Sequence, residues 1–359
     1  MDLNELRKEI DKLDDEILKL LNERMQVVKK VGEYKHKTKG AVYRPEREKE
    51  IIDRLESLSK KQNGLLNKKA IEAIFMQIIA VSRNYELPER VAYLGPEGSY
   101  SHQAAELKFG AMSNYLPISS IEGVFKVLQN KEAKFGVVPI ENNTDGAIGA
   151  TLDSLAKYDS LIVAEEYMDI HHSFATVQDD IKKIKRIYSH PQGYNQCIGF
   201  LEEHFLTEVE FVPTRSTSAA AKRAADDPDS AAICSKIAAK LHHLPILFEK
   251  IEDNEANRTR FLILSDIKNG KSEFDKTSIL AKLDDTPGSL VEFLQKFKDV
   301  GINLLKIESR PIKEEKFKSM FFIDFEGHKD DENFQKLLND KDANYSIKWL
   351  GSYVDGEKK

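Results

Sequence analysis

The second half of the chain contains the run Asn257-Arg258-Thr259-Arg260-Phe261-Leu262-Ile263-Leu264. Its last four residues are bulky and apolar, which predicts a buried strand. Thr259 and Arg260 would lie at the mouth of this strand. A hydroxyl donor beside a guanidinium can bind an anion that must also lose an oxygen atom. The same pair is also typical of a solvated strand edge, so the pattern needs support from other parts of the chain.

Length and composition place the chain among globular proteins of two or three domains. It has 359 residues, of which 41% are hydrophobic and 32% charged, and its net charge is −6. This balance argues against a nucleic-acid or membrane partner. With no signal peptide and no apolar run of roughly 20 residues, we expect a cytoplasmic protein. Cys197 and Cys234 are far apart and lack metal-ligand neighbours, so we expect reduced thiols and no metal site there. We also expect no cofactor.

The first 87 residues predict three helices and a partner chain. A 3–4 spacing relates the apolar residues Leu6, Ile10, Leu13, Ile17, Leu20, Val27 and Val31. With no proline between Leu3 and Thr38, this predicts one helix of roughly 35 residues, about 50 Å long. Pro45 opens a second helix to about Lys60, and Asn67 caps a third to about Glu86. Two short helices cannot cover so long a stripe, so we expect an intertwined dimer.

Polar residues interrupt the apolar faces of these helices. Arg24 and Lys35 follow the stripe of the first helix, Glu48 lies on the inner side of the second, and Ser82 and Glu86 continue the row of the third. Charges that face a helical core cost several kcal/mol each unless they are paired or bind a ligand. The pattern therefore fits either a buried ion-pair network or a cationic pocket for a small polyanion.

Several of these residues resemble the all-helical chorismate mutases over most of residues 3–87. The motifs are residues 6–11, Asn22-Glu23-Arg24, Lys35 and residues 43–48. The resemblance implies a chorismate site completed by Arg7 of the partner chain, with Lys35 and Glu86 as catalytic groups. It would contain Arg7, Arg24, Lys35, Arg44, Arg47, Glu48, Ser82 and Glu86. The reaction is a pericyclic rearrangement, so the site has to hold one conformer and stabilise charge on the ether oxygen. Many bacterial relatives have glutamine where this chain has Glu86.

Between residues 88 and 268 one unit recurs: a strand, a loop rich in hydroxyl and amide groups, and a helix. The expected strands are residues 90–94, 135–140, 187–188 and 209–212. This alternation predicts an α/β domain with a largely parallel sheet. Its ligand site would lie at the carboxyl ends of the strands, where helix N-termini offer backbone N–H groups to anions.

The loops of this segment resemble prephenate dehydratase throughout. The matching motifs are residues 95–101, 138–142, 189–192 with Gln196-Cys197, 216–220 and 259–261. The resemblance implies two α/β lobes, similar to a periplasmic binding protein, with prephenate between them. It implies a site made of Ser99, Tyr100, Ser101, Glu141, Asn142, Thr144, His190, Gln192, Ser216, Thr217, Thr259, Arg260 and Phe261.

In that family the threonine of the Thr-Arg-Phe motif, here Thr259, is the essential group. The reaction expels carboxylate and hydroxide and forms an aromatic ring. We expect Thr259 to donate a hydrogen bond to the leaving oxygen, and Arg260 to fix the loop or a carboxylate. A neutral hydroxyl is a poor acid, so the proton source stays open, with His190 and Glu141 as candidates. Asn143 departs from the serine or threonine usual in relatives.

Residues 275–355 predict a small regulatory domain. Strands at 277–283, 302–307, 320–325 and 345–350, with helices at 288–300 and 333–338, give the βαββαβ order of a ferredoxin-like fold. Two motifs resemble the ACT domain, and the resemblance implies L-phenylalanine bound there at a dimer interface. The motif residues are Gly288, Ser289, Leu290, Glu308, Ser309, Arg310 and Pro311.

The sequence thus predicts a multidomain chain with boundaries at 1–87, 90–266 and 275–355. The favoured hypothesis is a bifunctional enzyme of phenylalanine biosynthesis, inhibited by L-phenylalanine and assembled as a homodimer or larger homo-oligomer. One alternative is a dehydratase whose helical domain only dimerises. Another is a non-catalytic sensor of aromatic metabolites, and the C-terminal domain could also be purely structural.

Overall fold

The computed structural model describes residues 2–38, 45–86, 90–110, 113–144, 146–254, 256–284, 286–311, 319–338 and 345–358. The chain forms two compact units. The first contains Met1–Glu89 with Phe109–Asn114, and the second contains Arg90–Lys108 with Tyr115–Lys359.

The first unit contains the three predicted helices, α1 (Leu3–Thr38), α2 (Pro45–Lys61) and α3 (Lys68–Glu86). Pro45 is the first residue of α2, where its missing N–H costs nothing. Asn67 caps α3, because its Oδ1 accepts the N–H of Ala70 at 3.0 Å. The prediction for this segment is confirmed.

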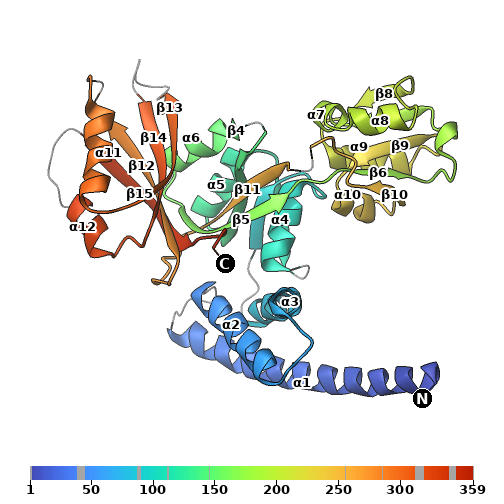
Figure 1. Cartoon of the computed structure of the whole chain (residues 1–359), viewed down its shortest axis with the longest axis horizontal. Coiled ribbons are helices and arrows are strands. Elements are labelled where there is room, and N and C mark those ends of the chain that lie inside the picture. Colours follow the sequence, from blue (N-terminus) through green and yellow to red (C-terminus); the bar gives the residue numbers. More distant parts are fainter. Residues whose placement is uncertain are drawn as a thin grey trace. The chain divides into compact units, whose positions relative to one another are not determined.

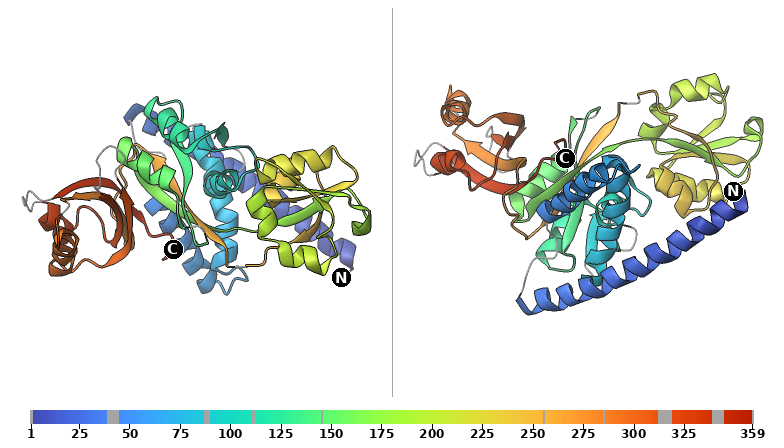
Figure 2. Two further views of the ribbon diagram at one scale, coloured as in Figure 1. Left: turned by 90° about the horizontal axis from the view of Figure 1, so that it is seen from above. Right: turned by 60° about the horizontal axis from the view of Figure 1, so that its bottom comes forward.

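Helix α1 is one continuous rod that extends far beyond α2 and α3 (Figures 1 and 2). The seven apolar residues of its predicted stripe are each between 38% and 63% exposed. Burying one such side chain contributes about 1.5–3 kcal/mol. A stripe left open in one chain favours a second copy, and the intertwined dimer stays a prediction.

The second unit begins with a lobe built on a six-stranded sheet in the order β2-β1-β3-β11-β5, with β4 paired to β3. Its strands are β1 (Arg90–Leu94), β2 (Asn114–Ile118), β3 (Phe135–Asn142), β4 (Gly146–Ala147), β5 (Leu161–Asp169) and β11 (Arg258–Ser265). Its helices are α4 (Tyr100–Phe109), α5 (Ile121–Gln129) and α6 (Gly149–Lys157). This part is called the first lobe below.

The second lobe has a five-stranded sheet in the order β10-β6-β9-β7-β8. Its strands are β6 (Ser173–Thr176), β7 (Arg186–Ser189), β8 (Glu210–Pro213), β9 (Ser230–Cys234) and β10 (Ile246–Glu249). Its helical segments are η1 (Ile181–Lys183), α7 (Pro191–Asn195), α8 (Ile198–Glu203), α9 (Thr217–Ala225) and α10 (Lys236–Leu241). Two α/β lobes are thus confirmed, and the likeness to a periplasmic binding protein stays a prediction.

The prediction of a largely parallel sheet is wrong. Among the described pairings, β1 with β3 and β7 with β8 and β9 are parallel. Strand β11 returns from the second lobe and inserts antiparallel between β3 and β5. Strand β6 is antiparallel to both β9 and β10. The repeating strand–loop–helix pattern identifies the units, but it contains no information on where a returning strand inserts.

The C-terminal part has the predicted βαββαβ order and an antiparallel sheet arranged β13-β14-β12-β15. Its elements are β12 (Asp275–Leu283), α11 (Ser289–Asp299), β13 (Leu304–Pro311), β14 (Ser319–Glu326), α12 (Glu332–Leu338) and β15 (Tyr345–Val354). Helices α11 and α12 cover one face of this sheet, which is called the regulatory sheet below after its predicted role (Figure 1). On the other face, Leu280, Met320 and Phe322 join the core of the first lobe. The regulatory sheet and the first lobe therefore share one continuous core.

Candidate active sites

Helices α1 and α3 bring together four of the residues predicted to bind chorismate. Lys35 Nζ lies 2.7 Å from Glu86 Oε2, and Arg24 donates a hydrogen bond to the Ser82 hydroxyl. Burial lowers the pKa of Arg24, while the charge of Glu86 acts in the opposite direction. The result is a partly buried cluster that contains cations, a hydroxyl and a carboxylate.

A close approach of the two helices holds this cluster. A Cβ atom on Gly32 would lie 2.7 Å from the carbonyl oxygen of Glu86 and 2.9 Å from its Cα. Both distances are shorter than a van der Waals contact, so only glycine fits between α1 and the end of α3. The sequence analysis did not identify Gly32, although a glycine inside a long apolar-periodic helix is a usable sign of close packing.

Glu48 is buried, as its position on the inner side of α2 predicts, and it pairs with Arg83 Nη1 at 3.1 Å. Arg83 was also missed, although it lies three residues before Glu86 on α3. Arg47 is exposed and pairs with Glu50 at 2.8 Å within its own helix. Arg7 is exposed on α1, and Arg44 lies outside the described residues.

In the first lobe, Thr259 and Asn142 form a hydrogen-bonded pair. They lie opposite each other on β11 and β3, and Asn142 Nδ2 is 2.8 Å from Thr259 Oγ1 and 2.7 Å from Asn257 Oδ1. Because the amide donates to Oγ1, the hydroxyl proton of Thr259 remains available to another acceptor. Thr259 and Arg260 are buried and lie within the strand, so the prediction that they lie at its mouth is wrong. The strand begins at Arg258, which pairs with Asp169 of β5, and a carboxylate of β5 pairs with Arg260 inside the sheet.

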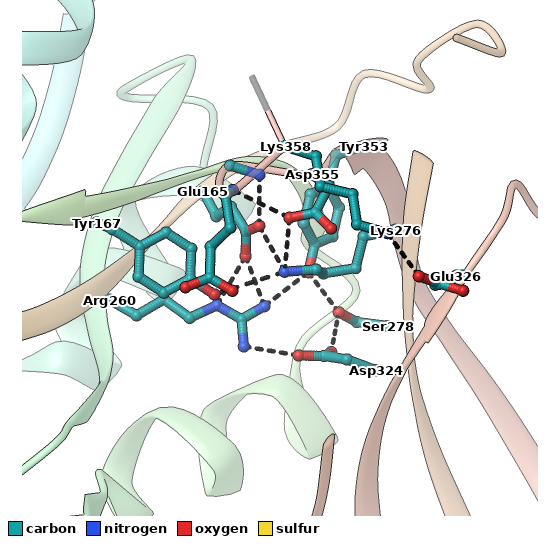
Figure 3. A network of polar contacts seen from close by, with 12 residues as sticks. Glu165, Tyr167, Arg260, Lys276, Ser278, Asp324, Glu326, Tyr353, Asp355 and Lys358 are labelled. Atoms are coloured by element: carbon teal, nitrogen blue, oxygen red, sulfur yellow. Dashed lines mark hydrogen bonds and ion pairs between the residues drawn. The ribbon is translucent and has the colours of Figure 1, made fainter. Parts of the chain in front are cut away.

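Glu141 and Arg260 form the next pair of the same two strands and face the opposite side. Arg260 is only 2% exposed and lies in an ion network with the first lobe and the regulatory sheet (Figure 3). Its guanidinium donates to Glu165 at 2.7 Å and to Asp324 at 2.6 Å. It also donates to the Tyr353 hydroxyl at 3.0 Å and to Glu141 at 3.2 Å. The structure thus places Thr259 with Asn142, and Arg260 with Glu141, on different faces.

The loop before α4 is bound to the second lobe. Ser218 Oγ donates to the carbonyl of Glu97 at 2.5 Å, and Ser235 Oγ donates to that of Gly98 at 2.9 Å. Gly98 has φ +80°, and a Cβ there would lie 2.7 Å from Ser218 Oγ. The backbone of this predicted substrate loop therefore requires glycine at position 98.

A polar cluster near the two connections between the lobes was not predicted. These connections run from β5 to β6 and from β10 to β11. Tyr100 Oη lies 2.9 Å from both His172 Nδ1 and the carbonyl of His171. His172 Nε2 is 2.9 Å from Gln196 Oε1, and its backbone N–H donates to Glu252 Oε2 at 2.8 Å. Burial lowers the pKa of His172. Tyr100 and Gln196 belong to the quoted motifs, but a histidine that follows a strand gives no local sign of this contact.

Other predicted residues fill local roles in this structure. His190 and Ser216 cap α7 and α9, where their side chains accept backbone N–H groups. Ser99 Oγ donates to the carbonyl of Leu94, and Ser101 is buried. The side chain of Phe261 lies in the core at 1% exposure. Thr217 is the first residue of α9, Gln192 lies in α7, and the N–H of Thr144 donates to Asn142 Oδ1 at 2.9 Å.

The predicted effector residues lie on two elements. Gly288, at φ +95°, precedes α11, which begins with Ser289 and the partly buried Leu290. Residues 308–311 belong to β13, where Ser309 and Pro311 are exposed. Arg310 forms a two-pronged ion pair with Asp153 of α6, at 2.9 and 3.0 Å.

Two further findings concern the residues that the structure describes. None of their helices combines the length and apolar character needed to cross a membrane. They contain no group of three or more His, Cys, Asp or Glu side chains arranged to hold a metal ion.

Comparison with known proteins gives three family models in sequence. The model for chorismate mutase type II matches residues 6–87, that for prephenate dehydratase matches residues 91–269, and that for the ACT domain matches residues 277–342. A prephenate dehydratase from Arthrobacter aurescens, solved in complex with L-Phe, is 32% identical with a TM-score of 0.68. The alignment covers 75% of this chain and 91% of that one. Fold and sites therefore define a helical mutase unit joined to a two-lobed dehydratase and a regulatory sheet.

Two bifunctional relatives align with this chain over nearly its whole length. The bifunctional chorismate mutase/prephenate dehydratase of Aquifex aeolicus is 40% identical over 354 residues, 98% of each chain. That of Pseudomonas aeruginosa is 38% identical over 361 residues, 98% of this chain and 97% of that protein. The chain belongs to the family of bifunctional chorismate mutases/prephenate dehydratases, and it is an enzyme with both activities.

Proposed function

We propose that the helical unit rearranges chorismate to prephenate and that the two lobes convert prephenate to phenylpyruvate. L-Phenylalanine acts as a feedback inhibitor through the regulatory sheet. Family membership supports the two activities and their regulation, and the residue roles rest on the geometry described above.

For the mutase step, the cluster of Arg24, Lys35, Ser82 and Glu86 supports a site for a dicarboxylate. Arg24 holds a carboxylate of chorismate, and Lys35 donates to the ether oxygen, where negative charge develops as the bond breaks. Glu86 accepts from Lys35 in the present structure and would have to be protonated to donate to the same oxygen. Arg7 of a second chain completes the site, and the exposed apolar stripe of α1 supports that dimer.

For the dehydratase step, the observation that carries the proposal is the hydrogen bond from the Asn142 amide to Thr259 Oγ1. Asn142 donates to Thr259 Oγ1, so the hydroxyl donates to the leaving oxygen of prephenate. The C–carboxylate bond breaks to release carbon dioxide, and its electron pair completes the aromatic ring as the C–O bond breaks. The departing hydroxide takes a proton that is supplied by solvent and leaves as water. Glu141 faces away from Thr259 and contacts Arg260 and Lys306, so we do not propose it as the proton donor.

Turnover by the purified full chain tests this function. With chorismate as substrate, its absorbance should fall and phenylpyruvate should appear, and L-phenylalanine should slow the second step. Thr259→Ala should reduce phenylpyruvate formation more than about tenfold, or 1.4 kcal/mol, and leave chorismate consumption unchanged. Thr259→Ser keeps the hydroxyl and serves as the control. Binding of both metabolites without turnover would instead favour the sensor hypothesis.

A further inference from the structure

We infer that Lys306, on the edge strand of the regulatory sheet, is a positioning residue for the dehydratase reaction. Lys306 contacts Glu141 on β3, the strand that also carries Asn142. Because Lys306 belongs to β13, which carries predicted effector residues, the position of β13 affects the position of Glu141. The inference rests on the proposed function and specifies how the same site is regulated.

Strand β13 has two faces with different neighbours. Lys306, Glu308 and Arg310 lie opposite Asp324, Phe322 and Met320 of β14. Phe322 and Met320 belong to the core shared with the first lobe, so this face of β13 is turned toward that lobe. Ile307 and Ser309 lie opposite Ile323 and Phe321, which pack on the side of α11 and α12.

The lobe-facing side of β13 contacts the first lobe through two ion pairs. Lys306 Nζ contacts Glu141 Oε2 at the end of β3. Arg310 pairs with Asp153, and its guanidinium lies against Gly149, where a Cβ would come within 2.5 Å of it. A displacement of β13 therefore acts on β3 and on the start of α6.

Glu141 is adjacent to the proposed catalytic pair. Glu141 faces Arg260 and Asn142 faces Thr259 across the same two strands. A β-bulge between Arg260 and Phe261 separates this four-residue block from the regular part of the sheet. Glu141 and Asn142 are consecutive on β3, so a shift of the strand backbone at Glu141 also moves Asn142. The amide of Asn142 sets the direction of the Thr259 hydroxyl through a 2.8 Å hydrogen bond.

Lys306 and Arg260 both contact Glu141, and Lys306 is the less buried of these two cations. Arg260 is almost fully buried and is held by Glu165, Asp324 and Tyr353. The side chain of Lys306 is 23% exposed and belongs to an edge strand. A ligand that binds on the exposed Ser309 side of β13 reaches the strand from its other face. Such a ligand changes dehydratase activity if it binds more tightly when β13 is displaced than when β13 has its present position.

Three variants of the full-length enzyme test the inference. Lys306→Met removes the charge and keeps the stem, and Lys306→Arg restores the charge. Lys348→Met is the matched control: Lys348, on β15, donates to the carbonyl of Tyr158 at 2.7 Å and so spans the same interface away from β3. The measurements are kcat and KM for prephenate, their response to L-phenylalanine, and the mutase rate on chorismate.

Lys306→Met should lower kcat for prephenate by about fivefold or more, the lower end of common coupling factors, and reduce the fractional inhibition by L-phenylalanine. Lys306→Arg should recover both, Lys348→Met should change neither, and the mutase rate should stay constant. Wild-type kcat and inhibition in Lys306→Met would overturn the inference, as would an equal loss in Lys348→Met. A wild-type enzyme that makes no phenylpyruvate from prephenate would overturn the proposed function itself.

Discussion

Replacing Asp324 by asparagine should strongly destabilise the part of the chain that joins the first lobe to the regulatory sheet. Asp324 is 1% exposed, and its two oxygens accept from Arg260 at 2.6 Å and from Ser278 at 2.5 Å. The substitution keeps the shape but leaves the buried guanidinium short of one negative charge. Removing one partner of a buried ion pair costs about 3–5 kcal/mol. Because Glu165 remains 2.7 Å away, we expect the lower value, about 3 kcal/mol.

The chain has a single tryptophan, Trp349 on β15, whose fluorescence reports the unfolding of the regulatory sheet. Urea unfolding of wild type and Asp324→Asn gives the difference in free energy of unfolding. Asp229→Asn is the control, since Asp229 pairs with Lys185 at the surface with side chains 42% and 68% exposed. An exposed pair contributes roughly 0–1 kcal/mol. A loss in Asp324→Asn no larger than that of the control would refute the reasoning.

Three further predictions concern the helical unit. Gly32→Ala should lower the mutase rate about tenfold or more, because the new Cβ forces the end of α3 away from Lys35. The dehydratase rate should not change, and an unchanged mutase rate would contradict the packing argument. Glu86→Gln should raise the mutase rate, because glutamine can donate to the ether oxygen and no longer holds Lys35 in an ion pair; an unchanged or lower rate would remove this role from Glu86. Arg7→Ala and Arg24→Ala should each abolish mutase activity, and a mixture of the two under subunit exchange should recover part of it; no recovery despite proven exchange would exclude the shared site.

The helices could be predicted closely because their determinants are local. The 3–4 spacing, Pro45 and Asn67 fix the three helices of the first unit to within a residue or two. The βαββαβ order of residues 275–354 follows in the same way from short apolar runs and the turn at Gly288. In both regions the information lies within one element or at its ends.

The direction and the faces of the strands were harder to predict. The apolar run suggested a strand from Phe261, with Thr259 and Arg260 together at its mouth, whereas the strand begins at Arg258. Once these residues are in the strand, alternation sends Thr259 and Arg260 to opposite faces. Polar residues such as Thr259 and Arg260 suggest a loop, because the local sequence does not show that other strands will supply carboxylates to them.

The ion partners of Arg260 could not be predicted from the sequence. Asp324 is 64 residues away and Glu165 is 95, and each belongs to a strand whose sequence gives no separate sign of a charge inside the core. Burying Arg260 is affordable only because these acids and the Tyr353 hydroxyl reach it together, and that requires the regulatory sheet to be packed on the first lobe. Arg260, the residue beside the proposed catalytic threonine, thus finds its partners partly in the first lobe and partly in the regulatory sheet. On this geometry, an effector that moves the regulatory sheet changes the support of Thr259 without entering the site.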